Sequence, residues 1–247
     1  MSVERLSEHR RIWAAKPVLQ QIYGVWFRDL LATVPRNRVV LEVGAGPGLL
    51  TEWARAERPD LSWVATDLLG APWNDVVADG TRLPLRTGTV DHVVALDVLH
   101  HLADPYAFFA EAARVTRPGG SVVAIEPWVT PWSYPIYRFA HQEGCTLGID
   151  RTHPFGAGAK KDAFEGDGAL PWRIVRSTPP AEWEALDLAP PRTRTCNGFA
   201  YVLSLGFKRA SLLPRRAAGV ALAIDRVLSP LSRWTGMRAL IVWERRA

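Results

Sequence analysis

Three glycines at alternating positions, Gly44, Gly46 and Gly48, follow a short apolar run at 39–43. A glycine turn between a strand and a helix lets backbone amides approach a ligand closely, with the positive end of the helix behind them. The spacing differs from the G-x-G-x-x-G pattern that holds a dinucleotide pyrophosphate. Glu42 also precedes the turn, and its charge would repel a pyrophosphate but suits an ammonium or sulfonium group. The turn therefore favours a ligand with a cationic end.

Acidic residues end the apolar runs that come next along the chain. Asp67, Asp79 and Asp97 each follow a run that has the length of a buried strand, and Glu126 ends a later one. Right-handed crossovers place the carboxyl ends of parallel strands along one edge of a sheet. The sequence therefore predicts that these carboxylates gather beside the glycine turn.

Strands and helices alternate between residues 39 and 127, which indicates a mostly parallel sheet covered on both faces. A helix is expected over 105–115, with Asp104 as its N-cap and Pro105 in its first turn. The predicted strands lie at 39–43, 62–66, 75–78, 90–96 and 122–125. The fold class is thus a doubly wound α/β domain.

The stretch 39–128 resembles the methyltransferase domain of the class I enzymes that use S-adenosylmethionine (SAM), in their broad small-molecule group. Residues 42–48 resemble the first motif of that family, and Asp67 matches the residue that holds the ribose hydroxyls. Asp79 matches the residue near the adenine amino group. Asp97 opens a segment that lies beside the methionine part and the substrate, and 117–120 is similar to the turn before the fifth strand.

The resemblance implies a seven-stranded sheet in which the last strand, at 238–243, inserts antiparallel. It also implies SAM as the cofactor and a helical N-terminal lid, to which Tyr23 and Trp26 would belong. The cofactor-binding residues that follow from the motifs and the lid are Glu42, Gly44, Ala45, Gly46, Gly48, Asp67, Leu68, Asp79, Gly80, Asp97 and Tyr23.

The chain is expected to divide into a helical lid at 1–38, broken at Pro17, and a SAM-binding domain at 39–247. Within that domain, residues 128–198 are rich in Trp, Pro and Gly without a clean period, which predicts an irregular cap. A helix near 181–186 is the exception. A basic amphipathic helix is expected around 215–231.

Methyl transfer depends first on alignment of donor and acceptor, which can lower the activation barrier by ~7–11 kcal/mol. A general base increases the rate a further ~10²–10⁴-fold. His100 and His101 follow the fourth strand, and His101 is the first candidate base; packing under the sheet edge is its alternative role. His141 is the second candidate, if the cap folds over the site. His141, Glu143, Cys145 and His153 lack a recognised zinc spacing, so no metal is expected.

Five aromatic residues crowd beyond the fifth strand and would suit the wall of a pocket for a flat or apolar acceptor, or a sugar. Packing of the cap explains them nearly as well. They are Trp128, Trp132, Tyr134, Tyr137 and Phe139.

The net charge of +5 arises in the tail, because residues 201–247 carry 9 Lys/Arg against 2 Asp/Glu. The front of the chain is slightly acidic, so nucleic acid is not an expected partner. Two cysteines, and no apolar run near the ~20 residues of a membrane span, favour a cytoplasmic protein. The basic tail helix either packs on the sheet or touches a membrane surface that presents a lipid-linked acceptor.

The sequence thus predicts SAM-dependent methylation of a small molecule, most readily at oxygen and less readily at carbon or nitrogen. The acceptor would be a natural product, a sugar or a lipid-linked intermediate. Two alternatives remain open: a protein of this fold that binds SAM but catalyses a non-methylating reaction, and a nicotinamide enzyme.

Overall fold

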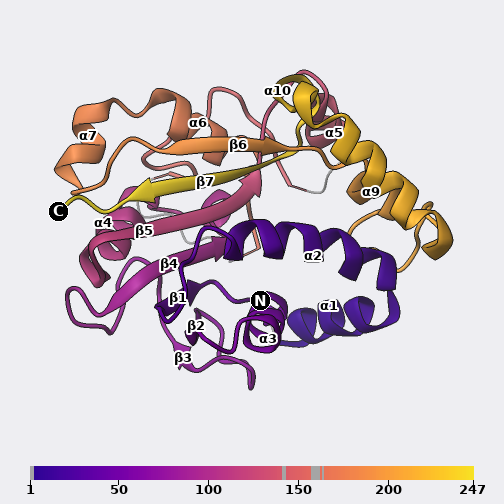
Figure 1. The fold of residues 1–247 in the computed structure, drawn as a ribbon. Coiled ribbons are helices and arrows are strands. Elements are labelled where there is room, and N and C mark those ends of the chain that lie inside the picture. The colour runs from indigo at the N-terminus through magenta and orange to yellow at the C-terminus, as the bar shows by residue number, and fades with distance from the viewer. Residues whose placement is uncertain (1–2, 141–142, 157–161, 163) are drawn as a thin grey trace.

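The computed structural model describes residues 3–140, 143–156, 162 and 164–247. Within these residues, a seven-stranded sheet lies at the centre, with helices on both of its faces (Figure 1). The strands, in spatial order, are β3 (Val76–Val77), β2 (Ser62–Asp67), β1 (Val39–Val43), β4 (Val90–Leu96), β5 (Thr116–Pro127), β7 (Arg238–Glu244) and β6 (Arg192–Cys196).

Strands β1 to β5 run parallel, whereas β7 is antiparallel to both of its neighbours, β5 and β6. The doubly wound sheet with an antiparallel last strand is therefore confirmed. The order of the strands reverses between β1 and β4, and a crevice opens outside the carboxyl ends of the strands at such a point. That crevice is where the predicted site residues should lie.

Alternate residues of the central strands point to opposite faces, as the pleat requires. One face packs against α4 (Pro105–Val115), α6 (Leu170–Ser177) and α7 (Pro180–Ala185), where Phe109 stacks edge-on against Trp183 at 5.0 Å between ring centroids. The other face is covered by α2 (Pro17–Leu31), α3 (Leu49–Glu57), α8 (Phe199–Ser204) and α9 (Ala218–Val227). The N-cap of α4 is Asp104, whose side chain accepts a hydrogen bond from the Ala107 amide, as predicted.

The N-terminal segment forms two helices, α1 (Val3–Ala15) and α2, which Pro17 separates as expected. Lys16, at the junction, is buried, and its Nζ lies 2.5–3.0 Å from the carbonyl oxygens of Ser204, Gly206, Lys208 and Ala210. Lys16 therefore anchors the end of α8 and the loop after it to the junction between α1 and α2.

The segment 128–198 is more regular than expected. It contains α5 (Ser133–Phe139), α6, α7 and the edge strand β6. The helix expected near 181–186 is α7. Pro171 and Pro180 lie in the first turns of α6 and α7, where proline is tolerated because those amides have no helical partner. His141 lies outside the described residues.

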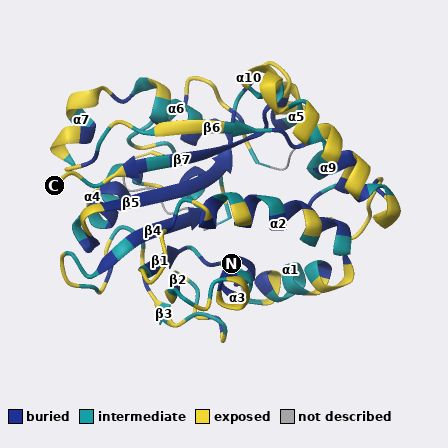
Figure 2. Cartoon of the chain, viewed as in Figure 1, coloured by how far each residue is buried: buried dark blue, intermediate teal, exposed yellow. Residues whose placement is uncertain are grey.

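The tail consists of the short turns η2 (Arg215–Ala217) and η3 (Ser229–Leu231) around α9, followed by α10 (Ser232–Thr235). Ala218 and Ala221 of α9 are buried, and Leu222 packs partly buried against the core. Val220, Ile224 and Val227 are exposed, on the face of α9 that Figure 2 shows open to solvent. Within the described part of the chain, the structure contains no helix with the length and apolar character needed to cross a bilayer.

Candidate active site

A cavity of about 510 Å³ lies at the carboxyl edge of the parallel strands. Its volume falls within the ~300–1,000 Å³ range of small-molecule sites. The cavity is lined by all the predicted cofactor residues except Gly48. Residues from α1, the loop after α8 and the first position of β7 complete the wall, and they include His9, Phe207 and Arg238.

The glycine turn has three residues with positive φ, of which two are also closely packed and one borders open space. At Gly44 (φ +72°), a Cβ would lie 2.5 Å from Val98 Cγ2, so close packing requires glycine. At Gly48 (φ +72°), which caps α3, a Cβ would collide with Trp73, so this glycine serves packing. At Gly46 (φ +53°), a Cβ would meet nothing nearer than 3.9 Å, which leaves open space beside the cavity wall.

Asp67 and Asp79 lie where the motif spacing placed them. Asp67 accepts hydrogen bonds from the Gly46 amide at 2.7 Å and from the Leu69 amide at 2.8 Å. Asp79 accepts from the Thr81 amide and hydroxyl, both at 2.8 Å. Leu68 is 57% exposed at the cavity wall. Both carboxylates are therefore held by local backbone groups at the edge of the cavity.

Glu42 is buried beneath the turn. Its Oε2 accepts hydrogen bonds from the Thr51 hydroxyl and, at 2.9 Å, from the Trp63 indole NH. Burial raises the pKa of this carboxyl to about 7, against the lowering effect of those two donors. Glu42 thus braces β1 against α3 and β2, which sequence reasoning did not foresee, and its direct contact with a ligand stays a prediction.

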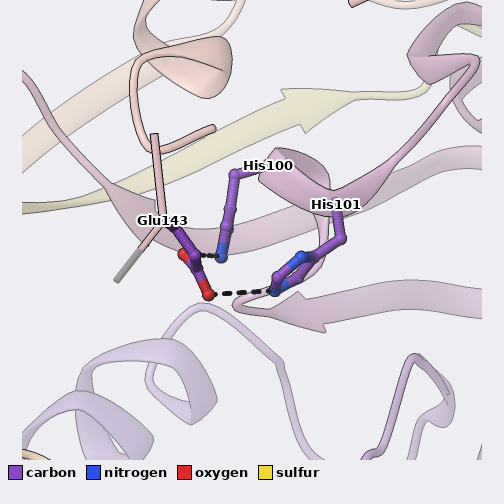
Figure 3. A group of neighbouring side chains, drawn as sticks. All are labelled: His100, His101 and Glu143. Carbon is purple, nitrogen blue, oxygen red and sulfur yellow. Dashed lines mark ion pairs between the residues drawn. The ribbon is translucent and has the colours of Figure 1, made fainter. Parts of the chain in front are cut away.

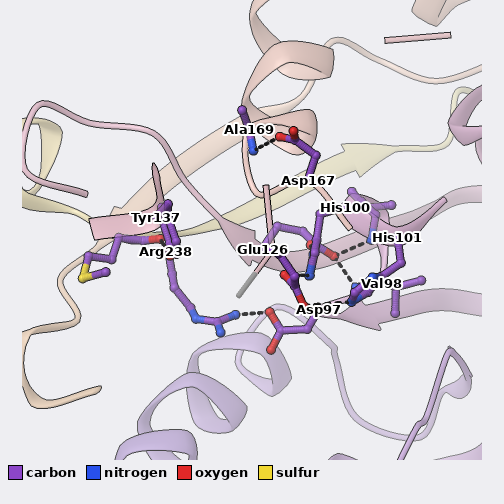
Figure 4. A network of polar contacts seen from close by, with 12 residues as sticks. Asp97, Val98, His100, His101, Glu126, Tyr137, Asp167, Ala169 and Arg238 are labelled. Carbon is purple, nitrogen blue, oxygen red and sulfur yellow. Dashed lines mark hydrogen bonds and ion pairs between the residues drawn. The ribbon is translucent and has the colours of Figure 1, made fainter. Parts of the chain in front are cut away.

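Asp97 ends β4 in a left-handed conformation (φ +58°) and pairs with the buried Arg238 (Figure 4). The Tyr23 hydroxyl donates to Asp97 at 3.5 Å. The guanidinium of Arg238 also lies 4.4 Å from the Trp26 ring centroid and 5.3 Å from that of Tyr201. Burial would lower the pKa of Arg238, but Asp97 and the neighbouring tyrosines outweigh it and keep this pKa well above its usual value.

Glu126, at the end of β5, is a fully buried carboxylate that organises the turn η1 (Leu99–His101). Its Oε1 accepts from the amides of Val98 and Leu99 at 2.7 and 2.8 Å, and its Oε2 lies 2.6 Å from His100 Nδ1. Burial lowers the pKa of His100, yet the charges and hydrogen bonds of Glu126 and Glu143 raise it to about 10 overall.

His101 lies beside His100, with 4.0 Å between the ring centroids. Its Nδ1 lies 3.1 Å from the backbone oxygen of Glu165, and its Nε2 faces Glu143 at 3.8 Å (Figure 3). His100 Nε2 faces the same carboxylate at 3.3 Å. All three side chains line the cavity, so the predicted base His101 is in the site.

Of the five aromatic residues beyond β5, Tyr137 lines the cavity and the other four do not. The Tyr137 hydroxyl donates to the Met237 carbonyl, Trp132 packs on Phe199, and Phe139 is 81% exposed. The aromatic wall comes mainly from distant segments instead, through Tyr23, Phe27, Phe164, Tyr201 and Phe207.

Sequence reasoning missed Arg238 and the residues of the loop after α8, and it named Glu143 only in a group with His141, Cys145 and His153. One signal for Arg238 was available: it is a charged residue at the start of the otherwise apolar run 239–243. Phe207 had no local signal, and the pairing of Glu143 with His100 and His101 could not be inferred locally, because both depend on how the cap and the tail fold back.

Residues 41–124 match the profile of the family described as "Methyltransferase domain". An uncharacterized methyltransferase of Mycobacterium sp. (strain JLS) is 33% identical over 140 residues, which are 53% of this chain and 56% of that protein. The chain thus spans about half the length of the curated relatives it matches.

Two solved structures share the fold. The geranyl diphosphate C-methyltransferase of Streptomyces coelicolor A3(2), in complex with Mg²⁺, geranyl diphosphate and S-adenosyl-L-homocysteine, has a TM-score of 0.56 at 13% identity, covering 92% of this chain and 80% of that one. A SAM-dependent methyltransferase from Archaeoglobus fulgidus has a TM-score of 0.51 at 16% identity, covering 90% and 93%.

The strand order, the glycine turn and the matched segment define a class I methyltransferase domain of the Rossmann-like fold. The protein carries such a domain, and SAM is the cofactor of this class.

Proposed function

We propose that the protein transfers the methyl group of SAM to a small-molecule acceptor, most readily at an oxygen atom. The observation that carries the proposal is the single cavity in which the turn at Gly46, the carboxylates of Asp67 and Asp79, and the pair His101–Glu143 meet. The first three groups fit a nucleoside, and the last two fit an acceptor that must lose a proton.

Different residues of the chain would bind different parts of SAM. Asp67 would accept from the ribose hydroxyls while still bonded to the Gly46 amide, and Asp79, also at the cavity wall, would accept from the adenine amino group. The open space over Gly46 admits the amino-acid part close to the backbone. Asp97 and Arg238 offer one negative and one positive group, which complement an ammonium and a carboxylate.

When bound, SAM supplies a methyl carbon on a positively charged sulfur. The acceptor oxygen bonds to that carbon as the electrons of the carbon–sulfur bond move to sulfur, and the hydroxyl proton must leave. His101 is the described residue best placed to act on that hydroxyl, because its Nδ1 is fixed by the Glu165 carbonyl and its Nε2 lies at the cavity. The part proposed for His141 stays a proposal from the sequence.

Calorimetry with SAM, S-adenosylhomocysteine and NADH tests the cofactor. We expect both sulfur nucleosides to bind and NADH not to bind. Asp67→Asn should weaken binding at least 10-fold, while Asp187→Asn, a change outside the cavity, should leave it unchanged. Binding of NADH in preference to SAM would overturn the proposal.

A SAM-binding protein that catalyses a non-methylating reaction is the main alternative. The two are separated by incubation with candidate acceptors and mass spectrometry. Methyl transfer produces S-adenosylhomocysteine and an acceptor heavier by one methylene, whereas the alternative consumes no SAM. A methylated carbon or nitrogen in the product would revise the atom but keep the reaction class.

A second proposal concerns the place of action: that α9 docks on an anionic membrane surface, in the cytoplasm, where a lipid-linked acceptor would be presented. Val220, Ile224, Val227 and Leu231 recur at helical spacing and are 48–76% exposed, and Trp234 beyond them is 53% exposed. The arginines around this stripe are exposed too: Arg215, Arg216, Arg226 and Arg233. Apolar side chains bordered by arginines suit an anionic lipid interface.

Co-sedimentation with vesicles tests this docking. We expect binding to phosphatidylglycerol vesicles and little binding to phosphatidylcholine alone. Replacing Arg215 and Arg216 by Gln should weaken binding by about 2 kcal/mol, roughly 30-fold, at ~1 kcal/mol per charge. Absence of lipid binding, or a dimer in sedimentation velocity that Val227→Ser dissolves, would assign the stripe to a second copy of the chain instead.

A further inference from the structure

His100 and His101 share an arrangement that goes beyond acid–base chemistry. Each ring uses Nδ1 for a fixed acceptor: the Glu126 carboxylate for His100, at 2.6 Å, and the Glu165 carbonyl oxygen for His101, at 3.1 Å. Because both acceptors can only accept, Nδ1 carries the proton in each ring, and each Nε2 is directed to the same side, toward Glu143 (Figures 3 and 4).

This is the pattern of histidines that bind metal ions. A metal-binding histidine nearly always donates its other ring N–H to a carboxylate or a backbone carbonyl, which fixes the ring and its tautomer. Here His100 donates to a carboxylate and His101 donates to a backbone carbonyl. Acid–base catalysis requires only one histidine oriented in this way. A purely structural role would not require either histidine to face a carboxylate in a cavity.

The distances between the three donor groups also fit an ion. One ligand atom each from His100, His101 and Glu143 lie within 4.8 Å of one another. The Nε2 atoms lie 3.3 and 3.8 Å from the Glu143 oxygens. Ligands at about 2.1 Å from a metal are about 3.0–3.4 Å apart in octahedral or tetrahedral geometry, so a small inward movement of His101 and Glu143 completes the set.

The charges balance as well. Glu126 and Glu143 contribute two negative charges. A metal ion would displace the Nε2 proton of His100, and a divalent ion then makes the group electrically neutral. Glu126 is fully buried, so its charge needs a positive partner in either state.

We propose that His100, His101 and Glu143 bind one divalent first-row transition-metal ion, of the Zn²⁺, Mn²⁺ or Fe²⁺ type, at the wall of the cavity. Two imidazoles and one carboxylate favour such ions over Mg²⁺, which prefers oxygen ligands. This proposal replaces the prediction from sequence that no metal binds, with a set of residues that shares only Glu143 with the group considered there.

The remaining coordination positions face the cavity that all three side chains line. The ion would take an acceptor with two oxygen donors, such as a hydroxyl next to a carbonyl, a carboxylate or a second hydroxyl. Metal binding would lower the pKa of that hydroxyl, so that its proton would pass to solvent water and His101 would no longer be needed as the base. Binding of the ion stands by itself, whereas its role toward the acceptor rests on the function proposed above.

The test is a titration of untagged, chelator-treated, dialysed protein with Co²⁺, whose visible absorption reports its ligands. We expect one equivalent to bind and Zn²⁺ to displace it, with Mg²⁺ ineffective. His101→Ala and Glu143→Gln should weaken binding by more than the ~10–100-fold typical of losing an outer partner. His153→Ala, an exposed histidine outside the cavity lining, is the matched control, and circular dichroism verifies the fold of each variant.

No Co²⁺ binding, or binding that His101→Ala and Glu143→Gln leave unchanged, overturns the proposal. Calorimetry with S-adenosylhomocysteine on the same preparations separates this failure from that of the proposed function. Nucleoside binding without Co²⁺ binding removes the metal and keeps the methyltransferase. Co²⁺ binding without nucleoside binding does the reverse.

Discussion

Asp97 and Arg238 form an ion pair between the end of β4 and the first residue of β7, across 141 positions of sequence. Arg238 is 5% exposed, whereas the Asp97 side chain is 27% exposed. The pair therefore joins the parallel strand β4 to the antiparallel strand β7. The buried Arg238 depends on Asp97 for its counter-charge more than the partly exposed Asp97 depends on Arg238.

Asp97→Asn should lower the free energy of unfolding by about 3 kcal/mol, because it leaves a buried guanidinium without a counter-charge. Arg238→Met should cost less, since Asp97 can reach water. The double variant should be more stable than Asp97→Asn. Urea denaturation of the four proteins measures the coupling, and simple additivity would contradict this view of the pair.

Glu42→Gln should change how stability depends on pH. The folded pKa of Glu42, about 7, is above its ordinary 4.5, so between these values the folded state binds more protons than the unfolded state. The stability that Glu42 contributes is thus complete below pH 4.5 and declines as the pH rises through 7, by about 3 kcal/mol in total. Gln keeps the acceptor for Thr51 and Trp63 without a charge. Denaturation at pH 5 and pH 8 should show the variant losing less stability than the wild type, and equal losses would refute this.

Gly46→Ala and Gly44→Ala should separate ligand binding from folding. Alanine at position 46 has room but a positive φ, so it costs about 1 kcal/mol of stability. Its methyl group projects into the open space at the turn, so affinity for S-adenosylhomocysteine should fall at least 10-fold. Alanine at position 44 also collides with Val98 and should cost about 2–4 kcal/mol. Thermal shifts with and without ligand measure both effects, and a Gly46→Ala protein with full affinity would mean that the turn does not contact the nucleoside.

Lys16→Met should make the loop after α8 more mobile, although Lys16 itself does not line the cavity. Lys16 Nζ lies within hydrogen-bond distance of four carbonyl oxygens at the end of α8 and in the following loop, which carries the cavity residue Phe207. Without the ammonium these oxygens lose a shared donor, which should cost about 2–3 kcal/mol. We expect faster hydrogen exchange in residues 205–211 and weaker nucleoside binding. Arg11→Met, an exposed change on the adjoining helix α1, should alter neither quantity.

What the sequence predicted correctly was local. The glycine turn, the strand-ending aspartates and the Asp104 cap depend on residues within one strand–helix unit, where spacing and backbone preference determine the structure. Strand β6 was missed because Arg-Thr-Arg-Thr-Cys at a sheet edge has no apolar run to reveal it. Helices α5 and α6 were missed because the segment 128–198 shows no clean helical period among its Trp, Pro and Gly residues.

The long-range parts of the site were beyond prediction for a related reason. Glu143 and Arg238 acquire their roles from partners 42 to 141 positions away, and a charged residue in isolation has no preferred partner. The tail helix was correctly expected to be amphipathic, but which face packs inward could not be inferred. The structure buries Ala218 and Ala221 of α9 and exposes Val220, Ile224 and Val227.

The position of β7 has a consequence for how the molecule assembles. β7 follows β6 along the chain, yet it lies between β5 and β6 in the sheet. Synthesis on the ribosome proceeds from the N-terminus, so β6 emerges before β7, the strand with which it pairs. Until β7 has emerged, the edge of β5 that β7 will cover remains unpaired. Direct pairing of β6 with β5 would be a misfolded trap, and a chaperone that shields this flank until residue 244 has emerged would raise the yield of native protein.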